Sequence, residues 1–223
     1  MSPLAVLFDM DGVLVNNYQY HVESWFAFGE KYGLGITQEV FDKNIAGHST
    51  QEAIQLTFKE KLTPEDVFRL SQEKELLYRK IYQPHIQEVN GLTHFLRKLK
   101  QANIPCAVAT SALPENITFT LEALNITDYF SATVSSLDVE NAKPAPDIYL
   151  KAAQDLGIAP QNCIVIEDSR AGIKAGKAAK CSVIALTTSH KATELYTVEP
   201  HFIVQDFTEL SVALLTQIQA KCV

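Results

Sequence analysis

Short apolar runs alternate with helical patterns along most of the chain, and this alternation limits the possible folds more than any other feature. The runs with the length and sharp ends of buried strands are Leu4–Phe8, Cys106–Thr110, Ala132–Ser135, Cys163–Glu167, Ser182–Leu186 and a weaker one at Phe202–Val204. Between the later runs, Leu92, Leu96 and Leu99 recur at helical spacing, and the alanine-rich stretch Arg170–Lys180 favours a helix. This order predicts an α/β fold, a Rossmann-like parallel sheet with helices on both faces.

A long stretch after the first run interrupts the alternation. It contains no convincing strand, and its helical patterns cover Tyr18–Tyr32, Thr50–Lys61 and Pro64–Tyr82. A helical insert after the first strand explains this most simply. We therefore predict a core domain of residues 1–15 and 85–223 and an inserted α-helical cap domain of residues 16–84.

Composition excludes several classes of protein. The net charge of −7, from 19 basic and 26 acidic residues, argues against a general nucleic-acid binder but not against a phosphorylated substrate. The N-terminus lacks the pattern of a signal peptide, and no apolar run reaches membrane-spanning length. The 4 cysteines form no Cys-x-x-Cys pair and are expected as buried free thiols. We expect a cytoplasmic monomer with no membrane or nucleic-acid partner.

Two carboxylates follow the first predicted strand, in the segment Asp9-Met10-Asp11-Gly12. Open parallel sheets bind ligands at the carboxyl ends of their strands. Asp9 and Asp11 share a strand face, and Gly12 allows a sharp turn that brings Asp11 back over the same pocket. Such a pair can hold a divalent cation, with one acid attacking phosphorus and the other moving protons. The alternative is a solvated turn with two acids.

Hydroxyl groups follow the second predicted strand. Thr110 and Ser111, together with free backbone N–H groups, would suit a phosphate oxygen. Alternatively, they cap a helix that opens at Pro114-Glu115. Both can hold at once, because a helix N-terminus itself favours anions.

Two more candidate groups lie later in the chain. Lys143 precedes Pro144 and Pro146, which predicts a stiff, extended loop that presents the ammonium to a carboxylate and a phosphate. The segment Glu167-Asp168 ends an apolar strand, and a turn there can bring both acids near one ion. A surface lysine and a helix cap at Asp168 or Ser169 are the alternatives. The ends of four predicted strands thus carry, in order, acids, hydroxyls, a lysine and acids. Together these groups favour a single site.

Four motifs carry a resemblance to a known superfamily. They are Phe8-Asp9-Met10-Asp11-Gly12-Val13-Leu14, Thr110, Lys143-Pro144-Ala145-Pro146-Asp147-Ile148-Tyr149 and Ile166-Glu167-Asp168-Ser169-Arg170-Ala171-Gly172. In order and spacing they resemble the haloacid dehalogenase-like hydrolases. The helical insert is similar to the cap of the beta-phosphoglucomutase-like branch. The resemblance implies a Rossmann-like core and a phosphohydrolase of small phosphorylated metabolites.

The resemblance also implies residue roles. Asp9 would attack phosphorus and become an aspartyl-phosphate, while Asp11 would protonate the leaving group and then activate water. Thr110 would bind the phosphate, and Lys143 would hold charge around the nucleophile. The implied cofactor is Mg²⁺, with Asp9, the Asp11 backbone carbonyl and Asp168 as ligands and Glu167 in or near the shell. Asp11 separates this chain from the dehalogenases and phosphonate hydrolases, so phosphate esters or anhydrides are expected.

Substrate contacts are predicted less directly. Asn17 and His21 share a helical face, and His21 resembles a cap histidine of the same branch, with a surface histidine as the alternative. Lys74 resembles a cap lysine, with a solvated helix lysine as the alternative. Ser111 and Asn116 are the remaining candidates for substrate binding, and Asn116 is alternatively only part of the helix start.

The cap loop Ala46-Gly47-His48-Ser49-Thr50 bears on the reaction. Sugar phosphomutases of this branch carry a lysine and an arginine around the glycine, where this chain has Ala46 and Thr50. A mutase must bind a second phosphate, and two missing cations remove strong contacts. Hydrolysis of a small phosphomonoester is therefore the first hypothesis. A sugar phosphomutase, a pyrophosphatase and a non-catalytic phospho-acceptor or binding module remain alternatives.

Overall fold

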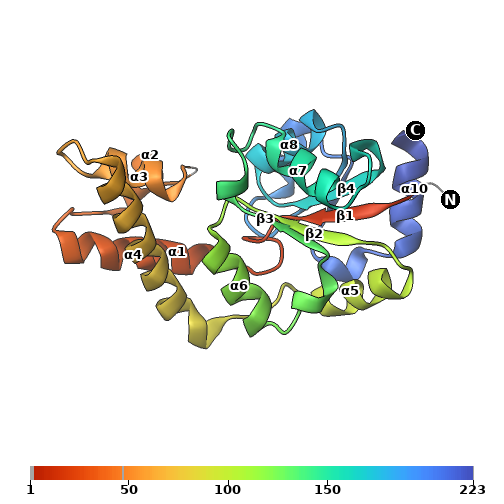
Figure 1. The fold of residues 1–223 in the computed structure, drawn as a ribbon, viewed down its shortest axis with the longest axis horizontal. Coiled ribbons are helices and arrows are strands. Elements are labelled where there is room, and N and C mark those ends of the chain that lie inside the picture. Colours follow the sequence, from red (N-terminus) through yellow and green to blue (C-terminus); the bar gives the residue numbers. More distant parts are fainter. Residues whose placement is uncertain (1–2, 47, 223) are drawn as a thin grey trace. The chain divides into compact units, whose positions relative to one another are not determined.

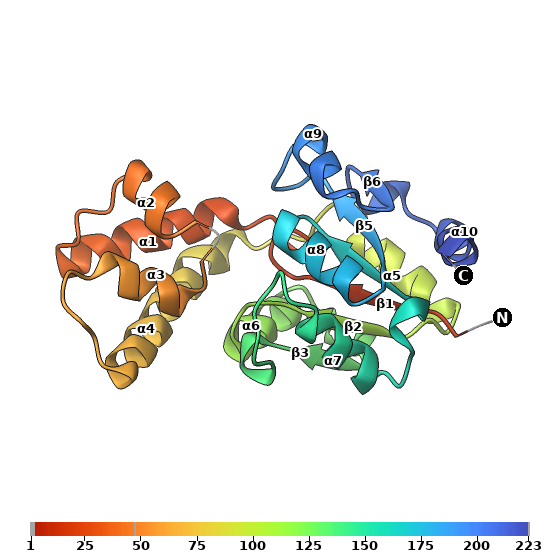
Figure 2. The same cartoon turned by 90° about the horizontal axis from the view of Figure 1, so that it is seen from above.

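The computed structural model describes residues 3–46 and 48–222, and side chains as far as Ala220. The chain divides into two compact units, a core unit of residues 1–16 and 87–223 and a cap unit of residues 17–86 (Figures 1 and 2). Each unit is described by itself. Among the described residues, no helix combines the length and the apolar character needed to cross a membrane.

The core unit is built on one parallel sheet. In the described residues its strands are β1 Ala5–Phe8, β2 Cys106–Ala109, β3 Ala132–Val134, β4 Cys163–Glu167, β5 Ser182–Leu186 and β6 Phe202–Val204. They lie in the order β3-β2-β1-β4-β5-β6, and every neighbouring pair is parallel. The strands β1, β2, β4 and β5 are fully buried and read as continuous apolar runs, which is why the sequence locates them clearly. The predicted α/β, Rossmann-like fold is confirmed.

The two faces of the sheet bury different side chains. Val6 and Phe8 point into one hydrophobic cluster and Ala5 and Leu7 into the other, as the twofold alternation of a strand requires. Helices α5 Leu92–Gln101, α6 Pro114–Ala123 and α10 Val212–Cys222 supply the first cluster. Helices α7 Asp147–Asp155, α8 Arg170–Ala178 and α9 Ala192–Leu195 supply the second. Helices thus cover both faces of the sheet (Figure 2).

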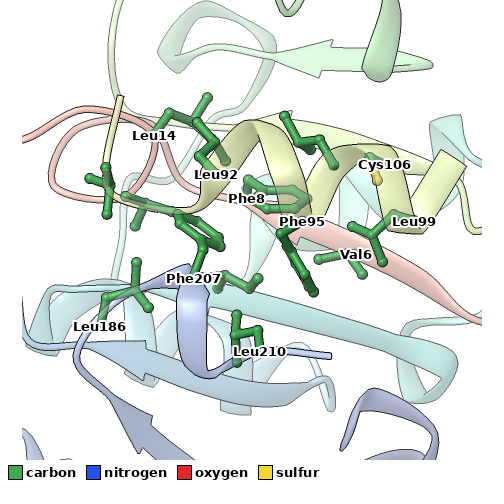
Figure 3. Close-up of a cluster of buried hydrophobic side chains, with 14 of the residues drawn as sticks. Val6, Phe8, Leu14, Leu92, Phe95, Leu99, Cys106, Leu186, Phe207 and Leu210 are labelled. Atoms are coloured by element: carbon green, nitrogen blue, oxygen red, sulfur yellow. The ribbon is translucent and has the colours of Figure 1, made fainter. Parts of the chain in front are cut away.

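Helix α5 shows how the first cluster is assembled. Its buried residues recur at helical spacing and are Leu92, Phe95, Leu96 and Leu99. The ring of Phe95 packs against Phe8 of β1, with centroids 6.4 Å apart, and against Phe207 at 5.7 Å (Figure 3). Burying one such side chain stabilises the fold by about 1.5–3 kcal/mol. This packing fixes β1, and with it the segment that follows, on the rest of the core unit.

All the regular secondary structure in the described residues of the cap unit is helical. It contains α1 Tyr18–Tyr32, α2 Gln38–Asn44, α3 Thr50–Thr57, α4 Pro64–Tyr82 and the 3₁₀ turn Gln83–His85. Its own small core includes Trp25, Phe28, Phe41, Ile54 and Leu70. Side chains of Thr37, Ser49 and Thr63 cap α2, α3 and α4.

Several predicted boundaries are wrong. The helix expected at Thr50–Lys61 ends at Thr57, because Phe58 adopts an extended backbone and packs its ring on Phe28 and Tyr32. The helix expected at Arg170–Lys180 ends at Ala178, and Lys180 has a positive φ of 63°. Strands β2 and β3 each end one residue earlier than predicted.

Candidate active site

Sheet topology brings the first and fourth strand ends together. From β1 the chain moves outward to β2 and β3, then returns to β4 on the other side of β1 and continues to β5 and β6. A reversal of this kind leaves a crevice at the carboxyl ends of the two strands that flank it. Asp9 follows β1 and Asp168 follows β4, and Asp9 N donates to Ile166 O at 3.0 Å. The two acids therefore meet at the crevice.

Three carboxylates and one ammonium form the centre of the site. Oxygens of Asp9, Glu167 and Asp168 all lie within 4.8 Å of one another, and all three residues are buried. Lys143 Nζ lies 3.0 Å from Asp9 Oδ1 and 2.8 Å from Glu167 Oε1. It also donates to the carbonyl of Ala109 at the end of β2, at 3.3 Å. The late lysine and both acidic segments, far apart in the sequence, thus converge as the sequence predicts.

The charges of this cluster do not balance. Burial raises the pKa of Asp9 to about 7, with Lys143 opposing the shift and Glu167 and Asp11 adding to it. Burial and the negative charges of Glu167 and Asp9 raise the pKa of Asp168 well above its usual range. For Glu167 burial acts in the same direction, but the charge and hydrogen bond of Lys143 prevail and lower its pKa. The site has a deficit of positive charge.

Glu167 anchors the site through its hydrogen bonds. Its Oε1 accepts from Lys143 and from Tyr149 Oη, at 2.8 and 2.9 Å. Its Oε2 accepts from Asp168 N, Ser169 N and Ser169 Oγ, at 2.9, 2.8 and 2.9 Å. These five bonds use the lone-pair positions of the carboxylate. Glu167 therefore holds Lys143 and the β4–α8 turn in place.

Two glycines make room for these acids. Gly12 has a φ of 77°, and a β-carbon at this position would overlap the Asp168 carboxylate. A β-carbon at Gly172, in the first turn of α8, would overlap the carboxylate of Glu167. Only glycine fits either position, and at Gly12 the positive φ also favours it. The glycines lie in the quoted motifs, but sequence reasoning gave Gly172 no role.

The second strand end contributes a buried hydroxyl. Thr110 is buried directly after β2, and its Oγ1 accepts a hydrogen bond from Ala112 N at 3.2 Å. Ser111 is exposed in the following loop, and Asn116 is buried in α6. The alternative helix-cap interpretation of Thr110 and Ser111 is wrong, because Leu113 is the N-cap residue of α6 and Pro114 its first residue. Thr110 stabilises a local turn instead.

The loop that carries Lys143 differs from expectation. It is not extended, because Ala145 N donates to Ala142 O at 3.0 Å and closes a turn; the Lys143–Pro144 peptide bond is cis. The surface-lysine interpretation of Lys143 is also wrong, because its side chain is only 7% exposed. At the fourth strand end, Ser169 Oγ accepts from Gly172 N at 3.0 Å and caps α8. Ser169 is thus the helix cap, and Asp168 belongs to the carboxylate cluster.

Asp11 lies in the turn after Asp9. It is half-buried and forms a β-bridge with Val15, while Gly12 N donates to Val15 O at 2.7 Å. The negative charge of Asp11 helps to raise the pKa of Asp9, so the two carboxylates interact electrostatically. The tight turn predicted at Gly12 is therefore present.

The predicted substrate-binding residues of the cap unit lie in contact with one another. Asn17 Nδ2 donates to Tyr78 Oη at 2.6 Å and lies 3.3 Å from His21 Nε2. His21 stacks on Tyr78, with centroids 3.9 Å apart, and its Nδ1 lies 3.2 Å from Lys74 Nζ. Lys74 in turn pairs with Glu75 at 2.9 Å. The alternative of a solvated Lys74 is wrong, because its side chain is 1% exposed. Gly47 of the predicted cap loop lies outside the described residues.

Three residues at the core site were not assigned a role from the sequence. Tyr149 donates to Glu167, Thr188 Oγ1 donates to Gly12 O, and Ser189 lies beside the Asp168 carboxylate at Gly12. Tyr149 lies in the third motif, in the first turn of α7, so its position was visible in the sequence. Thr188 and Ser189 follow β5, and the rule that ligands bind at strand ends was the available signal.

The core site suits a divalent cation. Besides its ion pair with Lys143, Asp9 Oδ1 has no hydrogen-bond partner among the described residues, although it is buried. Carboxylate oxygens are the ligands that Mg²⁺ prefers, and a divalent charge would offset the excess negative charge of Asp9 and Asp168. The donor set and the charge deficit therefore fit Mg²⁺.

Comparisons with known proteins agree with this geometry. A family model described as haloacid dehalogenase-like hydrolase matches residues 6–186. A beta-phosphoglucomutase of Bacillus subtilis is 32% identical over 185 residues, which cover 78% of this chain and 79% of that protein. The chain belongs to the haloacid dehalogenase-like hydrolase family.

Further relatives within this family extend the comparison. A phosphorylated carbohydrates phosphatase of Thermotoga maritima is 28% identical over 175 residues, 78% of this chain and 81% of that protein. The structure of a haloacid dehalogenase-like hydrolase from Entamoeba histolytica has a TM-score of 0.89 and 26% identity, and the match covers 97% and 99% of the two chains. The predicted family is confirmed, and the chain is an enzyme of the phosphohydrolase class.

Proposed function

We propose that this family member is a Mg²⁺-dependent phosphatase that hydrolyses a small phosphomonoester, such as a sugar phosphate, through an aspartyl-phosphate on Asp9. One observation carries the proposal: the buried Asp9 carboxylate lies between the Lys143 ammonium and a second carboxylate, Asp168, at the crevice of the sheet. Phosphoryl transfer depends mainly on positioning and on neutralising charge, and this arrangement serves both. A cytoplasmic monomer stays a prediction.

In the first step an oxygen of Asp9 forms a bond to phosphorus while the ester oxygen leaves with its electron pair. Asp11 gives that oxygen a proton, so the alcohol departs neutral. In the second step Asp11 takes a proton from a water molecule whose oxygen attacks phosphorus. The bond between phosphorus and Asp9 then breaks, which releases orthophosphate and restores the carboxylate. Thr110 and the neighbouring backbone N–H groups would hold phosphate oxygens in both steps.

The proposed cofactor ligands are Asp9, the backbone carbonyl of Asp11, and Asp168. When bound, Mg²⁺ would offset the charges of phosphate and carboxylate so that one anion can approach another. Glu167 is less suited to direct ligation, because five hydrogen bonds already occupy its oxygens. We assign it the task of keeping Lys143 beside Asp9.

We propose that substrate selection falls to the cap unit, through Asn17, His21 and Lys74, with Ser111 and Asn116 contributing from the core unit. In the cap unit, Thr50 donates to the Glu75 carboxylate at 2.7 Å, and Lys74 is already paired with the same oxygen. A cap whose buried cation is neutralised within its own unit is a poor receptor for a second phosphate. This favours a monophosphate substrate over the bisphosphate that a mutase needs.

A screen of phosphorylated metabolites tests the proposal, with orthophosphate release and sugar isomerisation measured in the same samples. Release of phosphate is the expected result, and isomerised sugar without phosphate release would favour the phosphomutase. Asp9→Asn is expected to abolish turnover, because an amide does not attack phosphorus, while the circular dichroism spectrum is unchanged. Near-normal release by Asp9→Asn would end the nucleophile assignment, and full activity in excess chelator would remove Mg²⁺ from the mechanism.

A further inference from the structure

The loop after β5 reaches two other loops of the core site. Thr188 Oγ1 donates a hydrogen bond to the carbonyl of Gly12, in the turn that follows Asp9. Its neighbour Ser189 places its hydroxyl beside the Asp168 carboxylate. A β-carbon built on Gly12 would lie 1.9 Å from Asp168 Oδ2 and 2.6 Å from Ser189 Oγ, so both side chains converge on the turn. Two adjacent hydroxyls thus tie the β1, β4 and β5 strand ends together.

The chemistry of this contact matters because Asp168 lies among like charges. A carboxylate only accepts hydrogen bonds, so a hydroxyl that points at it must donate. Asp9 and Glu167, the acids within 4.8 Å, repel the Asp168 carboxylate, and a hydroxyl that donates to it from the β5 loop would favour one orientation. Removing a hydrogen-bond partner that orients a metal ligand typically lowers metal affinity 10–100-fold.

We expect the fold not to depend on Ser189. It is an exposed loop residue that follows β5 and Thr187, outside any helix or strand. Its hydroxyl nevertheless lies beside a buried acid at the centre of the site. Removing this hydroxyl should therefore change the site more than the fold.

We propose that Thr188 and Ser189 are positioning residues that set the affinity of the core site for Mg²⁺. Ser189 orients the Asp168 carboxylate, and Thr188 fixes the backbone turn of Asp9-Met10-Asp11-Gly12. The proposal rests on the proposed function in one respect, namely that Asp9 and Asp168 bind the cation.

Calorimetric titration of Mg²⁺ into the full chain tests this without any turnover. The variants are Ser189→Ala, the hydroxyl-retaining Ser189→Thr, and the control Ser211→Ala, whose hydroxyl accepts from Leu214 N at the start of α10 instead. We expect Ser189→Ala to weaken Mg²⁺ binding about 10-fold or more. Ser189→Thr should recover most of the loss, and the control should bind as the unaltered protein does.

Two further measurements separate positioning from a merely structural role. The melting temperature of the metal-free protein should be the same for Ser189→Ala and the unaltered chain, while the rise produced by Mg²⁺ should be smaller in the variant. The Mg²⁺ concentration for half-maximal phosphate release should increase, with kcat at saturating Mg²⁺ and KM for substrate nearly unchanged. Thr188→Val, which removes only the hydroxyl, should act in the same direction.

Equal Mg²⁺ affinity in Ser189→Ala and the unaltered protein would overturn the positioning role and leave the proposed function intact. A drop in the metal-free melting temperature with unchanged Mg²⁺ affinity would also overturn it. Failure of the unaltered protein itself to bind Mg²⁺ would overturn both this inference and the metal assignment.

Discussion

Lys74 Nζ lies 2.9 Å from Oε1 of Glu75, its neighbour in α4, and the side chains are only 1% and 4% exposed. Removing one partner of a buried ion pair leaves the other charge uncompensated. We therefore expect Lys74→Met to destabilise the cap unit by about 3 kcal/mol. The double variant Lys74→Met/Glu75→Leu should lose less, because it buries no lone charge.

Trp25 provides the measurement for this pair. It is the 1 tryptophan of the chain, it is buried in the cap unit, and Lys74 Nζ lies 5.2 Å from its ring centroid. Urea unfolding followed by its fluorescence reports directly on the cap unit. Exposed Lys80 in the same helix gives the control Lys80→Met, which should change little. A double variant less stable than Lys74→Met would contradict the ion-pair explanation.

Lys143→Met should destabilise the metal-free core unit. The substitution leaves Asp9 and Glu167 buried without their shared ammonium, which costs about 3–5 kcal/mol. Mg²⁺ should restore part of this stability, because it replaces some of the missing positive charge. Chemical denaturation with and without Mg²⁺ measures both effects. The control is Lys174→Met, at an exposed position of α8; a similar loss in both variants would refute the charge argument.

Gly172→Ala should destabilise the protein although alanine favours helices. In an exposed helical position the change from glycine to alanine gains about 1 kcal/mol, but here the new methyl group would overlap the Glu167 carboxylate. We expect a net loss, measured by thermal unfolding. Comparing Lys174→Gly with Lys174→Ala gives the propensity difference in the same helix without the overlap. If Gly172→Ala proved stabilising, the close approach of Glu167 would be disproved.

The start of α3 predicts a dependence of stability on pH. Ser49 Oγ accepts from Glu52 N at 3.3 Å, and the Glu52 carboxylate accepts from Ser49 N at 3.0 Å and Ser49 Oγ at 2.8 Å. These bonds lower the pKa of Glu52 below its ordinary value of 4.5. Their contribution is thus fully present above about pH 4.5 and is lost as the pH falls through the lower folded-state pKa.

Ser49→Ala should accordingly lower cap stability by about 1 kcal/mol at pH 7. The difference from the unaltered chain should shrink as Glu52 becomes protonated, because one half of the capping box is then already lost. Trp25 fluorescence during urea unfolding at pH 7 and at pH 3 measures this. A difference that grows on acidification would contradict the assignment.

The core fold is largely predictable from the sequence because four of its strands, β1, β2, β4 and β5, are fully buried. β1 and β4 read as unbroken apolar runs that end in acids. Three helices were missed among the described residues. The α10 segment carries few charges to mark a polar face, while α2 and α9 are only 7 and 4 residues long, too short to give a clear period. The early end of α3 depends on tertiary packing of Phe58, which no local pattern contains.

The candidate site is predictable where its residues follow strands and less so elsewhere. The loops at the carboxyl end of the parallel sheet carry Asp9, Lys143 and Asp168, so their convergence follows from topology. The burial of Lys74 does not, because an isolated lysine in a helix gives no sign of the tertiary contacts around it. The hydroxyl of Ser189 was missed for a similar reason, since its neighbour Asp168 comes from another strand end.

The central place of β1 in the sheet also has a consequence for the order of assembly. Val6 pairs with Cys106, and Ala5 pairs with Cys163, so β1 is synthesised before either of its partner strands. Contacts between such distant segments form late and slow the folding of a domain. The proposed nucleophile is therefore made well before the segments that complete its surroundings.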